Sequence, residues 1–409
     1  MSLSPQEQSM RHLIANKIAA TPNRRISFAE YMNLVLYHPE QGYYATGAVN
    51  IGSEGDFFTS SHLGNDFGEL LAEQFAQMWD ILEHPKPFTL VEMGAGQGLV
   101  AADVLSYLYR QYPDCFTALD YIIVEKAAGL ITQQQQVLNQ LNLPGLPLRW
   151  CTFDQISENS ITGCCFSNEL VDAFPVHQVV LEKGQLQEVY VTTVTTEADG
   201  INFGEVTDEI STPELKEYFQ WMGVDLYSGA YPEGYRSEVN LAALDWMKTI
   251  ADKLKQGFLL TIDYGYSTDR YYLPARHQGT LKCYYRHRHH DNPYVYIGQQ
   301  DITAHVNFTA LERQGELSGL QTVGLTKQGL FLMALGLGDR ISALSGSESR
   351  QGDAIAGAQD VIRIMRRRDA LHQLIDPTGL GGFTVLVQGK GLSQEKARSL
   401  KGLTIPPMA

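Results

Sequence analysis

The stretch that decides the fold is Leu90-Val91-Glu92-Met93-Gly94-Ala95-Gly96-Gln97-Gly98, with Ile122-Ile123-Val124-Glu125 further along the chain. An apolar run leads into three glycines at alternate positions, and a helix-like segment, 99–109, follows. Because glycine has no Cβ, the backbone at these positions can approach a ligand closely. The second apolar run ends in Glu125, whose carboxylate can accept hydrogen bonds from ribose hydroxyls. The pattern predicts a nucleoside-type cofactor across the carboxyl ends of adjacent parallel strands.

The spacing of the glycines indicates which nucleoside. The dinucleotide fingerprint is G-x-G-x-x-G, and its helix N-terminus holds a pyrophosphate. This chain has E-x-G-x-G-x-G instead, in which Glu92 precedes Gly94, Gly96 and Gly98. A carboxylate there repels phosphate and suits the amino group or the sulfonium of S-adenosylmethionine. The charge argument therefore favours a methyl donor over NAD, with its amino-acid portion over the glycines and its ribose at Glu125.

Composition excludes several classes of protein. The chain has 409 residues, of which 44% are apolar and 19% charged, as in ordinary globular proteins with a substantial core. Its net charge of -15 argues against a broad basic surface for nucleic acid and favours a cationic partner, although solubility alone explains acidity in many proteins. No stretch approaches the ~20 apolar residues of a membrane span. The N-terminus lacks the features of a secretory signal, and the five cysteines form no C-x-x-C. We therefore expect reduced thiols and a cytoplasmic protein.

The order of the expected elements indicates an α/β fold. Apolar periodicity and turn residues predict helices at 5–20, 27–37, 66–82 and 238–256, and strands at 88–93, 121–125, 148–151, 163–167, 258–263, 320–326 and 383–388. Ser27 with Glu30 has capping-box spacing, and Gly257 is expected to cap the last of these helices. Alternating strands and helices predict a parallel sheet covered on both faces. We expect a helical N-terminal extension with a lid loop at 1–83, a main domain at 84–391 with insertions at 176–236 and 266–307, and a tail at 392–409.

Six motifs extend the comparison to nearly the whole chain. They are Gly55-Asp56-Phe57-Phe58-Thr59-Ser60, Phe67-Gly68-Glu69-Leu70, the 92–98 loop, Ser167-Asn168-Glu169-Leu170-Val171-Asp172-Ala173-Phe174-Pro175-Val176, Ile262-Asp263-Tyr264-Gly265 and Asp301-Ile302-Thr303-Ala304-His305-Val306. With these motifs, residues 8–391 resemble the MidA family of class I S-adenosylmethionine-dependent methyltransferases. The resemblance implies a Rossmann-like sheet with inserted substrate-binding segments. Ala95 and Gln97 depart from the proline and arginine frequent in the family, and Ser61-His62 from its Pro-Glu.

The resemblance also implies an activity and a partner. Mitochondrial members of the family are assembly factors of respiratory complex I that methylate a protein arginine. The expected acceptor is the complex I 49 kDa-type subunit of an NAD(P)H-quinone oxidoreductase. Two alternatives remain open: methylation of a small molecule or another side chain, and an assembly chaperone that binds the donor without turnover.

An arginine acceptor needs carboxylates, because its guanidinium, with a pKa above about 12, stays charged. The segment after the strand at 163–167 supplies Glu169 and Asp172, three residues apart, which can grip a guanidinium as a fork. The alternative is that one of them caps a helix. Asn168 is expected beside the donor. His305 is a candidate to take up the proton released by the product, or a structural residue.

Three further features are less specific. Thr59 is expected near the donor's amino-acid end, with Phe57 or Phe58 against the adenine or, equally, in the core. Asp154 is expected at the adenine amino group or on the surface. The run 279–291 is rich in histidine, arginine and tyrosine. Its spacing is poor for zinc and the run is short for nucleic acid, so we expect no metal site. The resemblance implies a loop near the substrate cleft, with either a substrate-facing or a structural role.

Overall fold

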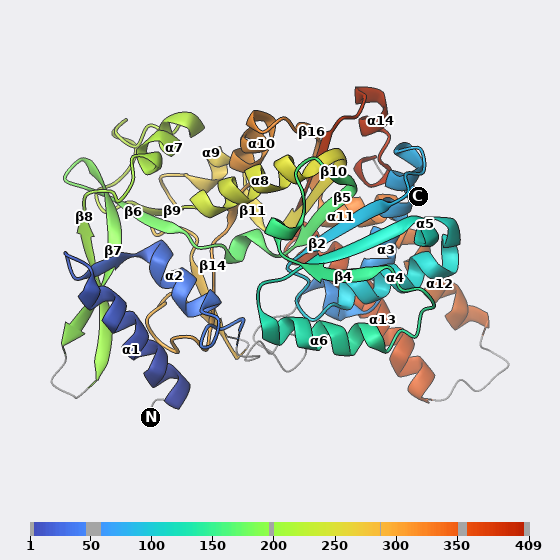
Figure 1. Ribbon diagram of the computed structural model, residues 1–409, viewed down its shortest axis with the longest axis horizontal. Coiled ribbons are helices and arrows are strands. Elements are labelled where there is room, and N and C mark those ends of the chain that lie inside the picture. Colours follow the sequence, from blue (N-terminus) through green and yellow to red (C-terminus); the bar gives the residue numbers. More distant parts are fainter. Residues whose placement is uncertain (1–3, 46–58, 196–199, 287, 351–357, 405–409) are drawn as a thin grey trace.

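A mixed sheet forms the larger part of the molecule, at the right in Figure 1. The computed structural model describes residues 4–45, 59–195, 200–286, 288–350 and 358–404. In spatial order the sheet contains β16 (Gln321–Lys327), β17 (Thr384–Lys390), β10 (Leu254–Asp263), β5 (Ile161–Asn168), β2 (Phe88–Met93), β3 (Leu119–Val124) and β4 (Leu148–Cys151). All seven strands expected from the sequence are therefore present, and the α/β class is confirmed.

The expectation of a wholly parallel sheet is wrong at one edge. The five strands from β10 to β4 are parallel, but β17 pairs antiparallel with both β10 and β16. Antiparallel neighbours need no crossover helix between them. A buried apolar strand has the same residue pattern whether it runs parallel or antiparallel to its neighbours, so its residues alone do not reveal this reversal.

Helices cover both faces of this sheet. Alternate strand residues, such as Leu90 and Val91, belong to two separate apolar cores. The first core is formed with α3 (Asp66–Ile81), α4 (Leu99–Gln111), α5 (Pro113–Ala118), α6 (Ala128–Asn139), α11 (Gln328–Leu335) and α13 (Ala358–Ile375), and α12 (Leu337–Arg350) packs beside α13. The second core is formed with α8 (Leu241–Lys253) and α10 (Phe308–Leu317). The helices therefore shield the sheet on both sides.

Gly257 does not cap a helix, contrary to the expectation from the sequence. Helix α8 ends at Lys253 and β10 begins at Leu254, so Gly257 lies inside the strand with φ of +137°. A Cβ at Gly257 would lie 1.9 Å from the carbonyl oxygen of Gly163 on β5. The glycine is needed for close strand approach.

A smaller lobe, at the left in Figure 1, is built around a five-stranded sheet. Its strands are β1 (Arg25–Ser27), β6 (His177–Glu182), β7 (Gln185–Thr195), β8 (Ile201–Asp208) and β9 (Arg236–Val239). Helices α1 (Pro5–Ala20), α2 (Phe28–Tyr37) and α7 (Glu214–Met222) pack on it, and β12 (Lys282–Tyr285), β13 (Arg288–His290) and β14 (Asp301–Thr303) form a small sheet beside it. The capping box of Ser27 and Glu30 is present, whereas β1 was not expected.

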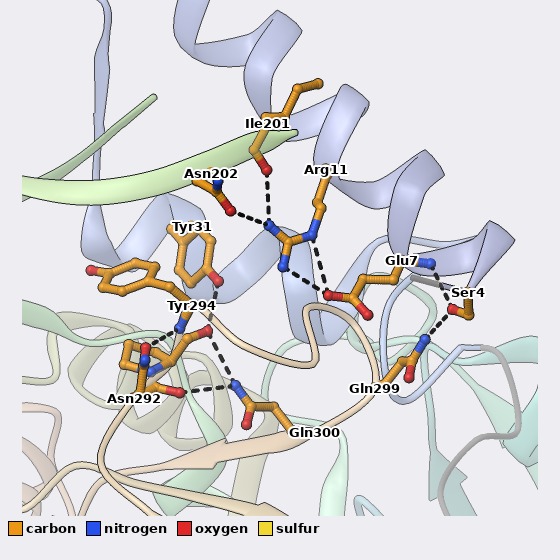
Figure 2. Close-up of polar contacts among 11 residues, drawn as sticks. Ser4, Glu7, Arg11, Tyr31, Ile201, Asn202, Asn292, Tyr294, Gln299 and Gln300 are labelled. Atoms are coloured by element: carbon orange, nitrogen blue, oxygen red, sulfur yellow. Dashed lines mark hydrogen bonds and ion pairs between the residues drawn. The ribbon is translucent and has the colours of Figure 1, made fainter. Parts of the chain in front are cut away.

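Polar contacts join the segments of this lobe (Figure 2). The Arg11 guanidinium on α1 donates to the carbonyl of Ile201 at 2.9 Å. The Tyr31 hydroxyl on α2 donates to the carbonyl of Pro293 at 2.7 Å, and Gln299 donates to Ser4. The two N-terminal helices thus pack with both inserted segments, while α3 packs on the large sheet.

The C-terminal segment also joins the larger part. Helix α14 (Gln394–Arg398) is followed by Leu400, which is fully buried in the core beneath α3 and α11. Within the described residues, no helix is long and apolar enough to cross a membrane.

Candidate active site

A cavity of about 1900 Å³ opens at the carboxyl ends of β2, β3, β5 and β10. Its walls come from the loops after these strands and from the lobe side, including Tyr37, Tyr44 and Asp301. Ligand pockets commonly measure about 300–1,000 Å³, so this cavity has room for a cofactor and part of a second substrate.

The glycine loop forms one wall. Gly94 and Gly96 line the cavity with φ of +70° and +53°. A Cβ at Gly94 would lie 2.6 Å from Cδ1 of Leu170, so any side chain there would displace this neighbour. Gly98, with φ of +80°, is the N-cap of α4 and packs beneath Gln134 instead of lining the cavity. The loop thus offers bare backbone to a ligand.

Glu92 places a carboxylate beside this loop. The side chain is 4% exposed, lines the cavity and accepts a hydrogen bond from the Tyr121 hydroxyl at 2.7 Å. Burial raises the pKa of Glu92 to about 7. A cationic ligand group would stabilise the charged carboxylate here, which fits the amino group or the sulfonium of S-adenosylmethionine.

Glu125 also lines the cavity, at the end of β3. Its Oε1 accepts from the backbone amides of Lys126 and Ala127 at 2.8 and 3.0 Å, and its Oε2 accepts from Gln134 at 3.3 Å. These bonds fix the carboxylate at the position expected for a ribose contact.

Gln134 is a residue that we did not expect from the sequence. Its amide donates to the carbonyl of Gly96 at 2.9 Å and to Glu125, while its oxygen accepts from Trp150 at 2.9 Å. The residue is fully buried between Leu130 and Leu138 on α6. The sequence does contain a signal for a special role of Gln134. This residue interrupts an i, i+4 apolar stripe and lies inside a run of four glutamines.

The second pair of carboxylates follows β5. Glu169, with φ of +51°, accepts from Asn168 at 3.2 Å and from the amide of Ser60 at 3.4 Å. Asp172 lies in a short 3-10 turn, Val171–Ala173, and is 5% exposed. Both side chains line the cavity, and neither caps a helix. Burial, with Asp172 nearby, raises the pKa of Glu169 to about 8; burial raises that of Asp172 to about 6.

Asp263 fixes this turn from behind. Its Oδ2 accepts from the amides of Val171 and Asp172 at 2.9 and 3.3 Å. The next residue, Tyr264, donates its hydroxyl to Oδ2 of Asp172 at 2.5 Å. Burial and the charges of Asp172 and Glu169 raise the pKa of Asp263. Three carboxyl groups thus crowd together with few cationic partners, although we expected only two of them as site residues.

His305 lines the cavity next to Tyr264. Its ring stacks on Tyr266 at 5.0 Å and meets Tyr264 edge-on at 5.1 Å. Burial, and to a lesser degree Arg276, lowers the pKa of His305 to about 4, and among the described residues its Nδ1 has no hydrogen-bond partner. The imidazole is therefore neutral at neutral pH, and its low pKa disfavours proton uptake.

Thr59 and Asn168 line the cavity, and Asp154 does not. Asp154 is exposed in a short 3-10 turn, where Phe153 lines the cavity instead. The Thr59 hydroxyl lies 2.6 Å from Nδ1 of His62, and Nε2 of His62 lies 3.4 Å from Gln97. His62 and Gln97, two positions that depart from the family pattern, therefore lie close together at the donor end of the cavity.

The structure describes only some of the remaining residues that the sequence analysis singled out. Phe57 and Phe58 lie outside the described residues, as does His287 of the 279–291 run. His289 of that run lines the cavity. In the part of the chain that the structure describes, no three His, Cys, Asp or Glu side chains are arranged so that they could hold a metal ion.

Comparison with known proteins decides the family. Residues 70–326 match the model of Methyltransf_28, a family of S-adenosyl-L-methionine-dependent methyltransferases. The chain belongs to this family. This result confirms a methyltransferase of the class I fold with S-adenosylmethionine as its cofactor, and Glu92, the glycine loop and Glu125 fit that donor.

Curated relatives and a solved structure extend the match. The mitochondrial protein arginine methyltransferase NDUFAF7 homolog of Drosophila melanogaster is 27% identical over 376 residues, 87% of this chain and 79% of the fly protein. Human NDUFAF7, a mitochondrial protein arginine methyltransferase, is 26% identical over 368 residues, 83% of this chain and 76% of its own. A COG1565 superfamily protein of Burkholderia thailandensis, bound to S-adenosyl-homocysteine, is 29% identical with a TM-score of 0.82, over 98% of this chain and 97% of its own.

Proposed function

We propose that this methyltransferase modifies an arginine side chain in a protein. The observation that carries the proposal is the pair Glu169 and Asp172, which lines the same cavity as Glu92 and Glu125. Burial raises the pKa of both members of the pair, so a cationic guest would relieve the cost of charging them. The names of the curated relatives support the same acceptor.

The chain's own residues then orient the acceptor. When bound, S-adenosylmethionine supplies an electrophilic methyl group. Glu169 and Asp172 accept hydrogen bonds from two guanidinium nitrogens and draw the positive charge toward themselves, which leaves the third nitrogen more nucleophilic. Methylation keeps the charge of the arginine, so one proton must leave. Burial lowers the pKa of His305 to about 4, so the carboxylates of Glu169 and Asp172, which the guanidinium keeps charged, accept this proton in preference to His305.

We further propose that the acceptor belongs to a 49 kDa-type subunit of an NAD(P)H-quinone oxidoreductase. The resemblance described above supports this partner, and the names of the relatives support a protein arginine as the acceptor. A flexible segment would enter beside residues 266–307, which supply Tyr284, His289 and Thr303 to the cavity wall. The cytoplasmic location remains a prediction, and the relatives quoted above are named mitochondrial.

The test is to incubate the protein with methyl-labelled donor and a cell extract, and to locate the label by mass spectrometry. We expect label on arginine in a protein, with the oxidoreductase subunit among the labelled species. Label on lysine, on carboxylates or only in metabolites would contradict the proposal. Donor binding without any transfer would favour a non-catalytic chaperone.

A further inference from the structure

Two cations line the cavity that holds the carboxylates. Arg270, on the short helix α9 (Thr268–Tyr271), and Lys327, the last residue of β16, both line its wall. Both side chains are exposed, so a solute that enters the cavity can reach them. The chain has 46 acidic residues against 31 lysines and arginines, so two cations that form no ion pair within the described residues are notable in this wall.

Neither cation is neutralised within the part of the chain that the structure describes. The Lys327 ammonium donates to the Thr384 hydroxyl at 2.9 Å, and the Arg270 guanidinium lies 5.5 Å from the ring of Tyr266. Among the described residues, no carboxylate lies within ion-pair distance of either group. A hydrogen bond from Ser267 and, to a smaller degree, the charge of Arg270 lower the pKa of Asp269, the preceding residue, but the side chains of Asp269 and Arg270 form no ion pair.

The two cations also affect each other. Partial desolvation lowers the pKa of Lys327, and the charge of Arg270 lowers it further. A third cation, Arg276, lies 4.1 Å from the Tyr266 ring and donates to the carbonyl of Arg270. Like charges held together cost free energy, and an anion between them would remove that cost.

Aromatic contacts connect this cationic wall to the carboxylates. Asp172 accepts from Tyr264, which meets His305 at 5.1 Å, and His305 stacks on Tyr266 at 5.0 Å. Tyr266 in turn contacts Arg270 and Arg276. The cavity is therefore bipolar along one continuous wall, with anions at one end and cations at the other.

We propose that Arg270 and Lys327 bind an acidic side chain of the acceptor polypeptide, close in sequence to the methylated residue. This subsite rests on the proposed function, because the carboxylate end must hold the arginine. An extended peptide advances about 3.3–3.6 Å per residue, so the ring-to-ring path, which is at most about 16 Å long, places the acid within about five positions of the arginine. A guanidinium clamp alone recognises only the arginine, whereas this subsite also discriminates between acceptor peptides by the residues around the arginine.

The test measures binding of two short labelled peptides by fluorescence anisotropy, at low salt and with saturating S-adenosylhomocysteine. Both carry one central arginine in a neutral sequence; one has glutamate four positions away on each side, and the other has glutamine there. We expect the glutamate peptide to bind at least about fivefold more tightly, against the net charge of -15. In the double variant R270Q/K327Q this preference should fall below about twofold.

The matched control is K216Q/K255Q, which removes two exposed lysines outside the cavity. This variant should keep the full preference. The proposal is overturned if the wild type binds both peptides equally, which includes the case in which binding of neither peptide is detectable. It is also overturned if R270Q/K327Q keeps the preference. A third peptide, with glutamine in place of arginine, separates the two claims. Equal binding with and without arginine, while glutamate is still preferred, would count against the proposed function and not against the subsite.

Discussion

The donor half and the acceptor half of the cavity are built in different ways. The donor half comes from one continuous strand-loop-helix unit, 88–111, and the end of the next strand, Glu125. The acceptor half combines the turn after β5, the end of β10, the 282–305 segment and tyrosines of the N-terminal region. A cofactor common to many enzymes can be held by one local motif, whereas the acceptor site of this chain requires the whole fold.

The carboxylates of the two halves also differ. Glu125 accepts two backbone hydrogen bonds and one from Gln134, so its geometry is fixed before a ligand arrives. Glu169 and Asp172 lie beside Asp263, and among the described residues one oxygen of Asp172 has no partner. The hydrogen-bonded Glu125 suits neutral hydroxyls, and the crowded pair Glu169 and Asp172 suits a cation.

The largest effect is expected from Asp172→Asn. This variant keeps the shape of the side chain and removes one of the two charges that grip the acceptor. Methyl transfer to extract protein should fall by about 100-fold, the loss typical of one preorganised electrostatic contact, with donor affinity unchanged. Asp245→Asn is the control, because Asp245 lines the same cavity from α8 but is exposed and pairs with Lys248. Equal losses in both variants would rule out a specific clamp.

A smaller loss is expected for Glu92→Gln in the donor half. The amide still accepts from Tyr121 but no longer offers a charge to the cationic part of the donor. Donor affinity should weaken by about 1.5–3 kcal/mol, the range for a hydrogen bond to a charged group. Calorimetry measures this directly, and an unchanged affinity would place the donor's cationic groups elsewhere.

The same residue predicts a pH dependence of stability. The pKa of Glu92 rises from its ordinary value of 4.5 to about 7 on folding, so the folded chain binds more protons between these values. The free energy of unfolding should therefore fall as pH rises through this range, by roughly 3 kcal/mol from Glu92 alone. Denaturant unfolding at pH 5 and pH 8 checks this. The decrease should be smaller in Glu92→Gln, and an equal decrease would assign it to other groups.

The smallest effect is expected from Gln134→Leu. Leucine completes the apolar stripe of Leu130 and Leu138 but removes the hydrogen bonds to Gly96 and Glu125. We expect donor affinity to weaken by about 0.5–1.5 kcal/mol, the value of an ordinary hydrogen bond. Gln135→Leu, at an exposed position on the same helix, should leave donor affinity unchanged. Equal effects of the two changes would mean that Gln134 does not hold the loop in place.

The sequence information for the donor half is local. Glycines at alternate positions, Glu92 and Glu125 all follow strands that apolar runs define, and the structure places Gly94, Gly96, Glu92 and Glu125 in one cavity. For Asp154, which follows a strand, the sequence leaves both an adenine contact and a surface position open, and in the structure the residue is exposed. Position after a strand does not determine which way a side chain points.

The acceptor half could be predicted only in part, because its contacts join distant residues. Asp263 supports a turn 91 positions earlier, and neither segment shows this on its own. The antiparallel β17 and the true role of Gly257 likewise depend on neighbouring strands. Such features are set by tertiary packing, which leaves no periodic signal in the chain.

The most direct test of the separation between the two halves compares Glu125→Gln with Glu169→Gln. Calorimetry gives donor affinity, and labelled transfer to extract protein at saturating donor gives turnover. We predict that Glu169→Gln keeps donor affinity within about twofold while turnover falls by about 100-fold, and that Glu125→Gln weakens donor affinity while turnover is largely restored at saturation. If affinity and turnover fall together in Glu169→Gln, that residue holds the donor or the fold, and the division into two halves is wrong.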